Sequence, residues 1–427
     1  MRPVVLMAWR NVRKNWRHSV ASLSSIAAGF LALGTFEGYV TDLRDRFGDS
    51  IRHKSMMGDV LIEKRGANEN GADDTWGLTL DEADQAAIDE ILAKDKPRFK
   101  AVVRSLDLGG MATNGKTSSV FAGVGFDIAE GMKIRAPNFV NNVIAGRIHS
   151  PDDPSAVILA MGLARSLDCG VEAKGATSVV ACKRNFLQLS TTTESGQLNA
   201  IEPTIRGIEQ LEIKEYDLRF LSLPLPLAQR LADTKRVSRY AVELLDSSEV
   251  PAFKDRLEAS FRSRGLDLEV TGWVYHRWSE LFRRGIELLA MFRNFVVIVV
   301  LVVAGMSVFN TMAKTVSERT REIGSLRALG FLRRQVVTLF VIEGTLLAGM
   351  GVVMGLVATL ALVFTINALG VPYDAGMMSE PIPLTLAYAH RVYLQATFFL
   401  VGVAVLAAYL PARRAARMSV PDALGHV

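Results

Sequence analysis

Four long apolar runs dominate the pattern of hydrophobic and polar positions along the 427-residue chain. They cover residues 19–40, 294–313, 344–369 and 392–410, each close to the length of about 20 residues that a helix needs to cross a bilayer. The flanking residues extend the second run into a stalk and move the start of the third towards residue 336. We therefore expect transmembrane helices at residues 19–40, 281–313, 336–369 and 392–410, with an outer loop at 370–391.

The segment between the first two runs, residues 41–280, contains no apolar run long enough to cross a bilayer. Its shorter apolar stretches follow either a period of two or a helical period, which predicts a mixed α/β domain. Strands are expected at residues 60–63, 101–108, 118–125, 241–245 and 266–270, and helices at 78–92 and 248–261. Asp81 is a candidate cap for the first helix and Gly265 a candidate end for the second. The predicted fold class is a four-helix membrane protein with a large mixed α/β domain between helices 1 and 2.

Basic residues gather on one side of the predicted spans. Residues 1–18 hold five Lys or Arg and no acidic residue, and residues 314–335 hold six basic against two acidic residues. By the positive-inside tendency, we expect both termini and the 314–335 loop in the cytoplasm and residues 41–280 outside. Residues 1–18 are then an amphipathic helix in the inner headgroup layer, and 411–427 a cytoplasmic tail. Since the net charge of +5 collects beside the membrane, no nucleic acid partner is expected.

The basic loop at 314–335 also has the pattern of a short helix. Thr315 with Glu318 three residues later is a candidate capping box, and Gly330 suits the left-handed position that ends a helix. The apolar positions recur on one face of that helix: Ile323, Leu326 and Leu329. Two other interpretations stay open, a loop that only fixes topology and a helix that lies on anionic headgroups.

The stretch S-E-R-T-R-E-I-G-S-L-R-A-L-G, residues 317–330, resembles the motif after the second membrane helix of FtsX/MacB-type ABC transporter permeases. Residues 155–167, read as a strand passing into a helix, and the closing segment 409–424 are similar to the same family. The resemblance implies that the short helix docks in a groove of an ABC ATPase subunit. The residues placed at that contact are Glu318, Arg319, Arg321, Glu322, Ile323, Leu326, Arg327 and Leu329.

The same resemblance implies a function for the whole chain. It would be a permease subunit in the bacterial inner membrane that couples ATP hydrolysis by a separate subunit to motion of its external domain. The cargo would be a lipoprotein, a peptide or a hydrophobic molecule that is exported or released. ATP and magnesium would bind the partner ATPase, and this chain would be no enzyme and hold no cofactor.

Further partners follow from the same resemblance. A second permease copy or a paralogue would complete a dimer, with a periplasmic adaptor or a lipoprotein outside and membrane lipid around the spans. The alternative function is a membrane-anchored scaffold or sensor that regulates an envelope process without transport.

One motif in the external segment has the letters of a nucleotide-binding loop but not its context. Residues 110–117, G-M-A-T-N-G-K-T, match the P-loop pattern G-x-x-x-x-G-K-[ST]. A P-loop must open a helix whose N-terminal amides hold phosphate, whereas these residues precede a strand-like run, S-S-V-F-A-G-V. Asn114-Gly115 is a strong hairpin signal. We therefore expect a hairpin here and no ATP site.

Cys169 and Cys182 are the only cysteines, too few for a disulfide scaffold or a metal cluster. In an oxidising compartment they can pair and close a loop of about a dozen residues, but the spacing does not decide the pairing. The six histidines lack ligand spacing, and no Ser or Thr has a base nearby in the sequence. No catalytic, cofactor or metal site is expected.

Small residues and two carboxylates mark positions within the spans. Gly351, Gly355 and Thr359 repeat every four residues and predict a face for close helix packing. Glu37 is expected to meet interfacial water, with a contact inside the helix bundle as the alternative. Glu343 is either a functional carboxylate or the partner of a loop arginine in an interfacial salt bridge.

Overall fold

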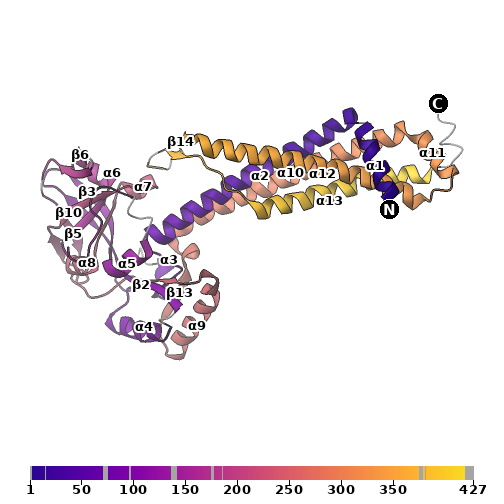
Figure 1. Cartoon of the computed structure of the whole chain (residues 1–427). Coiled ribbons are helices and arrows are strands. Elements are labelled where there is room, and N and C mark those ends of the chain that lie inside the picture. The colour runs from indigo at the N-terminus through magenta and orange to yellow at the C-terminus, as the bar shows by residue number, and fades with distance from the viewer. Residues whose placement is uncertain are drawn as a thin grey trace. The chain divides into compact units, whose positions relative to one another are not determined.

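The computed structural model describes residues 2–14, 16–70, 76–95, 98–135, 142–174, 177–184, 186–374, 378–379 and 381–418. The chain forms two compact units. The first comprises Met1–Asp45, Gly285–Pro372 and Pro383–Val427, and the second comprises Arg46–Arg284 and Tyr373–Ile382. Figure 1 labels many of their helices and strands.

The first unit is helical. Its helices are α1 (Arg2–Lys14), α2 (Trp16–Asp49), α10 (Glu280–Glu318), α11 (Thr320–Ala328), α12 (Arg333–Leu369) and α13 (His390–Arg417). Among the described residues, four helices are long and apolar enough to cross a membrane, at Ser19–Lys54, Arg277–Glu318, Arg333–Leu369 and His390–Arg417. The predicted four spans are confirmed, and each helix extends beyond its apolar run because the polar flanks continue the helical hydrogen bonding.

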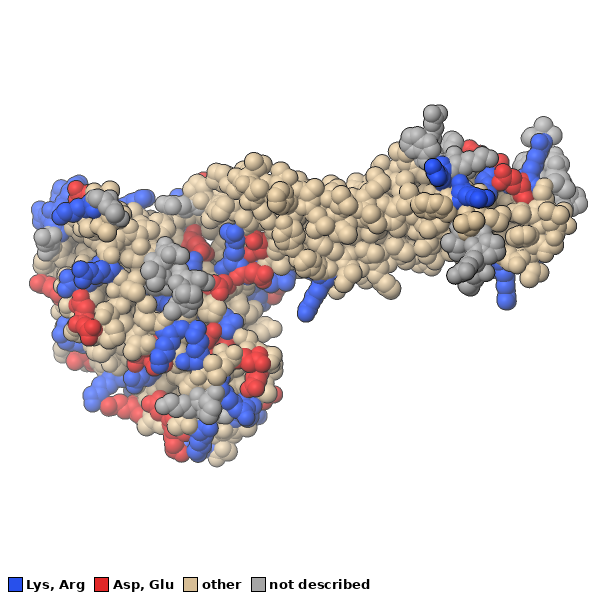
Figure 2. Space-filling model, viewed as in Figure 1, with Lys and Arg blue, Asp and Glu red and all other residues tan. Residues whose placement is uncertain are grey.

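The spans pack around a shared apolar core. α12 lies along α13 and also contacts α1. Ile26 and Phe30 of α2, Val308 of α10 and Leu347 of α12 are all buried in this core. Figure 2 shows a long uncharged surface over these helices, with Lys and Arg gathered at the end where Figure 1 labels α1 and α11. This distribution is what a bilayer requires of a helical bundle, since hydrocarbon cannot solvate charge.

The second unit is the predicted α/β domain. Its strands are β1 (Val60–Lys64), β2 (Phe99–Thr113), β3 (Ser118–Phe126), β4 (Val143–Gly146), β5 (Ala156–Ala160), β6 (Cys169–Lys174), β7 (Thr177–Cys182), β8 (Gln188–Thr192), β9 (Leu198–Ile201), β10 (Thr204–Glu209), β11 (Phe220–Pro224), β12 (Arg239–Leu244) and β13 (Leu268–Gly272). Its helices are α3 (Ala67–Asn70), α4 (Glu82–Asp95), α5 (Ile128–Arg135), α6 (Met161–Ser166), α7 (Lys214–Asp217), α8 (Leu225–Ala232) and α9 (Val250–Ser263). Two short strands, β14 (Pro372–Tyr373) and β15 (Ile382–Pro383), lie between α12 and α13.

The large sheet of this domain has the order β13-β1-β12-β2-β3-β11-β5-β10-β4, with β8 on β2 and β9 on β8. Both of its faces are covered, because side chains of β2 alternate between two apolar clusters. Leu106 and Leu108 belong to the cluster that includes α4, α8 and α9. Ala101 and Val103 belong to the cluster formed with α5. Successive side chains of β2 point to opposite faces of the sheet, and each face is buried by its own apolar cluster.

Most predicted elements of the domain are confirmed with shifted ends. The β12–α9–β13 unit is present, and β1 lies between its two strands, antiparallel to both. Gly265 ends α9 with a φ of +65°. The helix expected at 78–92 begins later, at Glu82, because the Asp81 carboxylate accepts the Asp84 N–H at 2.8 Å and so caps the helix there.

The P-loop look-alike is a hairpin, as predicted. β2 and β3 pair antiparallel up to Thr113 and Ser118. Asn114 N–H donates to Thr117 O at 3.1 Å, and Gly115 has a φ of +79°. No helix follows whose amides could hold phosphate, since the next described element is β3.

Candidate functional site

The stretch that resembles the permease motif lies at the turn between α10 and α12. α10 runs through Glu318 and stops at Arg319, which has φ −110° and ψ 18°. The expected capping box of Thr315 and Glu318 is therefore wrong, because both residues belong to the last turns of α10. Thr315 is buried, and its carbonyl still accepts the Arg319 N–H at 3.2 Å, which keeps the helix continuous to this point.

The expected end of the short helix is confirmed. Gly330 has a φ of +96°. Its N–H donates to Arg327 O at 3.1 Å, and Phe331 N–H donates to Leu326 O at 3.1 Å. This pair of bonds is the Schellman motif, which requires a left-handed residue and therefore favours glycine. α12 then begins where the Gln335 side chain accepts the Leu332 N–H at 2.8 Å.

The apolar face of α11 is divided between the chain's own core and solvent. Ile323 is only 3% exposed and packs against α10, α12 and α13, where its neighbours include Val316, Phe340 and Ala412. Leu326 is half-buried, whereas Leu329 is 81% exposed. Of the three residues predicted to share a docking face, only the last two reach the surface.

Leu332 joins this exposed apolar surface, and the sequence interpretation missed it. It is 66% exposed in the turn that follows Gly330. The sequence contained a signal for this exposure, because Leu332 stands beside Arg333 and Arg334 in a basic loop outside the predicted spans. We call Leu326, Leu329 and Leu332 the leucine surface.

An ion pair fixes the start of α11 to α12. Arg319 Nη1 lies 3.0 Å from Glu343 Oε1 and 3.3 Å from Oε2, and Arg319 Nε donates to Glu322 Oε2 at 2.7 Å. The guanidinium also covers the Phe340 ring, 5.5 Å from its centroid. The Glu343 side chain is 3% exposed and the Arg319 side chain 12%. The predicted salt bridge of Glu343 with a loop arginine is thus present, and it is buried.

A second chain segment reaches the same carboxylate. Asn11 of α1 donates its side-chain N–H to Glu343 Oε1 at 2.6 Å. At the other end of α11, Arg327 Nη1 donates to the carbonyl of Ala416, in the last turn of α13, at 3.3 Å and to that of Met418, just past the helix, at 2.6 Å. α11 is consequently tied to α12 and α13 directly, and to α1 through the Glu343 carboxylate of α12.

The remaining residues expected at a partner contact lie at the surface. Glu318 is exposed and lies 3.8 Å from Lys314. Arg321 and Glu322 are exposed as well. Among the eight residues named from the resemblance, Arg319, Ile323 and Arg327 face the chain itself, and the others are at least partly open to a partner.

The small residues of α12 form the predicted packing face. A Cβ added to Gly351 would lie 2.8 Å from Ile26 Cβ, and one added to Gly355 would lie 2.7 Å from Phe30 Cβ. Thr359 is fully buried. Glycine therefore lets α12 approach α2 closely.

Glu37 does not meet interfacial water as expected. Its side chain is 6% exposed and lies 3.6 Å from the Arg293 guanidinium of α10. The alternative, a contact within the bundle, is the one observed. A single sequence could not decide this, because it does not show which residue of another helix lies opposite.

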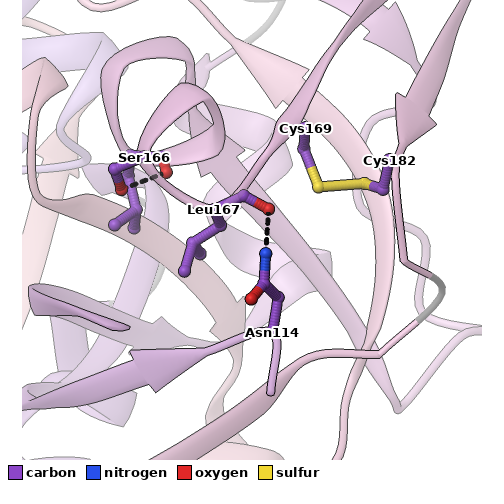
Figure 3. Close-up of a disulfide and its surroundings, with 6 residues drawn as sticks. Asn114, Ser166, Leu167, Cys169 and Cys182 are labelled. Carbon is purple, nitrogen blue, oxygen red and sulfur yellow. Dashed lines mark hydrogen bonds between the residues drawn. A yellow bond between two sulfur atoms is a disulfide. The ribbon is translucent and has the colours of Figure 1, made fainter. Parts of the chain in front are cut away.

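Cys169 and Cys182 are bonded to each other, with their Cα atoms 4.0 Å apart (Figure 3). They face each other across the β6–β7 hairpin, which pairs Cys169 with Cys182 in register. Beside them Asn114 donates its side-chain N–H to Leu167 O at 2.7 Å. The disulfide and this bond together hold the end of α6, the β2–β3 turn and the hairpin close to one another.

Fold and site together define a class of protein, a multi-pass membrane protein with a large α/β domain inserted between its first two spans. Residues 294–420 match the family model described as FtsX-like permease C-terminal. The "Macrolide export ATP-binding/permease protein MacB" of Shigella boydii is 35% identical over 136 residues, which is 32% of this chain and 19% of that protein. The protein of the same name from Campylobacter jejuni is 32% identical over 130 residues, 30% of this chain and 18% of its own length. About a third of the chain is therefore similar to ABC transporter permeases of the FtsX/MacB type.

The chain spans about a fifth of the length of these curated relatives. Two solved structures resemble it at low identity. The extracellular domain of the "noncanonic ABC-type transporter YknZ from Gram-positive bacteria" is 14% identical, with a TM-score of 0.34, over 50% of this chain and 99% of that one. The periplasmic region of MacB from Actinobacillus actinomycetemcomitans is 13% identical, with a TM-score of 0.35, over 54% and 94%. TM-scores of this size are too low to establish a shared fold.

Proposed function

We propose that this chain is a permease that binds a separate ABC ATPase through the leucine surface of α11 and the turn that follows. The observation that carries the proposal is the exposure of Leu329 and Leu332 inside the segment that matches the permease family. Burying one leucine contributes on the order of 1.5–3 kcal/mol. The exposed arginines around it, such as Arg333 and Arg334, contribute less each because water and salt screen them.

The contacts of α11 give a route by which such binding acts on the spans. Arg319 ties α11 to α12 through Glu343, and Arg327 ties it to the end of α13. Ile323 adds an apolar contact with α10, α12 and α13. A displacement of α11 would therefore move several spans rather than bend a free loop. We propose that ATP is bound and hydrolysed in the partner, together with magnesium.

The membrane orientation belongs to the same proposal. Basic segments at 1–18 and 314–335 support a cytoplasmic location for the termini and α11. The disulfide supports an oxidising compartment, such as the periplasm, for the α/β domain. We propose that the chain acts in the bacterial inner membrane as a dimer with a second copy or a paralogue.

The cargo is proposed as a class. The curated relatives are named for macrolide export. For this chain we propose export or release of a hydrophobic molecule, a peptide or a lipoprotein, handled by the α/β domain with an adaptor or a lipoprotein as outer partner. Motion of α11 would reach that domain through α10, which continues without a break from Glu280 to Glu318.

The test replaces both exposed leucines with aspartate, Leu329→Asp and Leu332→Asp. The chain is produced with each candidate ABC ATPase from the same genome, and co-purification and ATPase activity are measured in detergent. Losing two buried leucines should weaken the complex at least about 100-fold. Leu369→Asp is the matched control, because Leu369 is 69% exposed at the other end of α12.

The outcome separates the two functions that the sequence left open. If the double variant still binds its ATPase as tightly as the control, the leucine surface is not the binding site. If no ATPase co-purifies with the unaltered chain, the permease proposal gives way to a membrane-anchored scaffold or sensor.

A further inference from the structure

The outward side of α1 presents an amphipathic surface next to the first span. Leu6 is 57% and Trp9 47% exposed, and Arg10 and Arg13 are exposed too. These four positions follow the spacing i, i+3, i+4, i+7 and therefore lie on one face of the helix. Two apolar side chains and two arginines on one face are typical of a helix at a lipid headgroup layer.

The opposite side of α1 faces the protein. Ala8 is fully buried, and Val12 belongs to the same core as Leu347 and Ala348 of α12. Asn11 lies between them in the sequence and donates to Glu343. The helix is therefore packed on α12 by one side while its other side stays open.

The charge on the exposed face of α1 indicates which kind of ligand this face binds. No acidic residue occurs before Glu37, so nothing nearby in the sequence neutralises Arg10 and Arg13. α2 begins at Trp16 and its apolar span at Ser19, which keeps α1 beside the bilayer surface. A positively charged face with apolar anchors at this position complements anionic phospholipid headgroups.

We propose that the outward face of α1 binds anionic phospholipid and that Asn11 transmits this contact to α11 through Glu343 and Arg319. The three polar groups form a continuous chain: Asn11 Nδ2 is 2.6 Å from Glu343 Oε1, and the same oxygen is 3.0 Å from Arg319 Nη1. Arg319 lies where α10 ends and α11 begins, so a shift of the carboxylate changes the position of α11 directly. The anionic lipid content of the membrane thereby regulates the helix that carries the leucine surface.

The regulatory meaning rests on the proposed function, because it takes α11 as the ATPase-binding helix. The lipid contact and its transmission to α11 do not depend on the proposed ATPase binding. Both can therefore be read on the chain alone, without an ATPase. A failure of the lipid relay would leave ATPase co-purification untouched, and the reverse also holds.

The experiment uses two reporter cysteines in the full chain, one at a time. Because Cys169 and Cys182 are bonded, the introduced thiol is the one that labels. Leu6→Cys carries an environment-sensitive fluorophore, and Leu329→Cys carries a spin label. Each labelled protein is reconstituted in phosphatidylcholine vesicles with and without phosphatidylglycerol.

We expect phosphatidylglycerol to shift the fluorescence at residue 6 and to change the mobility of the label at residue 329. Arg10→Gln with Arg13→Gln should raise the phosphatidylglycerol needed for both responses about fivefold for each charge removed. The control pair Arg413→Gln and Arg414→Gln removes two exposed charges from α13 and should leave both responses unchanged.

Asn11→Ala separates binding from transmission. It should keep the fluorescence response at residue 6 and abolish the lipid dependence at residue 329, an effect that a purely structural role of Asn11 would not produce. If residue 329 still responds as in the unaltered chain, the route through Asn11 is overturned. If the α1 arginine pair behaves like the α13 control pair, the lipid-binding face is overturned.

Discussion

Arg319 and Glu343 form a buried ion pair, 3.0 Å from guanidinium to carboxylate, between the start of α11 and the third turn of α12. The pair sits where a solvated loop and a span meet. Because the pair is buried, loss of Arg319 would leave the Glu343 carboxylate without its cationic partner, whereas loss of Glu343 would leave Arg319 with Glu322. α11 is therefore a fixed part of the helical unit rather than a loose loop.

Breaking this pair on one side should destabilise the protein. Glu343→Gln keeps the shape of the side chain but leaves the Arg319 charge with Glu322 as its carboxylate partner, so the cost should stay below the about 3–5 kcal/mol of an unpaired buried charge. Replacing both residues by methionine should recover much of the loss, since no buried charge remains. Thermal unfolding of the unaltered protein and the two variants in detergent measures this, and a double variant as unstable as the single one would contradict the buried-charge argument.

The effect of a Gly→Ala substitution in α12 on stability should depend on the position of the glycine. Gly355→Ala places a Cβ 2.8 Å from Ala27 O and 2.7 Å from Phe30 Cβ, so α2 and α12 must separate, at a cost of about 1–3 kcal/mol. Gly349→Ala on the same helix meets nothing within 4 Å and should be neutral or slightly stabilising. The difference between the two unfolding midpoints is the measurement, and equal midpoints would show that the two helices do not pack as described.

The disulfide predicts a redox-dependent stability of the α/β domain. Cys169 and Cys182 are 13 positions apart, and closing a loop of that size contributes about 3 kcal/mol. Serine at both positions should therefore lower the unfolding midpoint of the full chain by several degrees, and a reducing agent should do the same to the unaltered protein. Non-reducing peptide mapping checks the bond itself; two free thiols in protein isolated from its native compartment would refute the pairing.

His149 predicts a loss of stability in mild acid. The ring is buried, its Nε2 lies 3.0 Å from Ser222 Oγ, and it meets the edge of Phe126. Burial, with the nearby positive charge of Arg135, lowers the pKa of His149 from 6.5 to about 3. Between these values the unfolded chain binds a proton that the folded protein does not, so stability falls as pH falls, by about 1.4 kcal/mol per pH unit.

The test compares the protein with His149→Asn. Both share every carboxylate, so the difference between their stability curves isolates the histidine. The unaltered protein should lose about 3 kcal/mol more than the variant between pH 6.5 and 4. Parallel curves over that range would show that His149 takes up its proton in the folded state.

Several features were predictable because each depends on neighbours in the sequence. Length and apolar composition alone give the four spans, since a bilayer imposes one length on every crossing. The hairpin at Asn114-Gly115 and the end of α11 at Gly330 follow from backbone conformations that few residues adopt. The small-residue face of α12 is likewise visible as a repeat of four.

Other features depend on what lies opposite, and only the tertiary structure decided them. Periodicity shows that Ile323 and Leu329 share an apolar face, but not that α13 covers the first and leaves the second open. Asn11 and Glu343 are 332 positions apart, and no local pattern relates them. The sequence by itself determined the spans, the inserted domain and the turn chemistry, because these are local. Burial and pairing of single side chains required the fold, because they are set by surfaces that the chain brings together from distant segments.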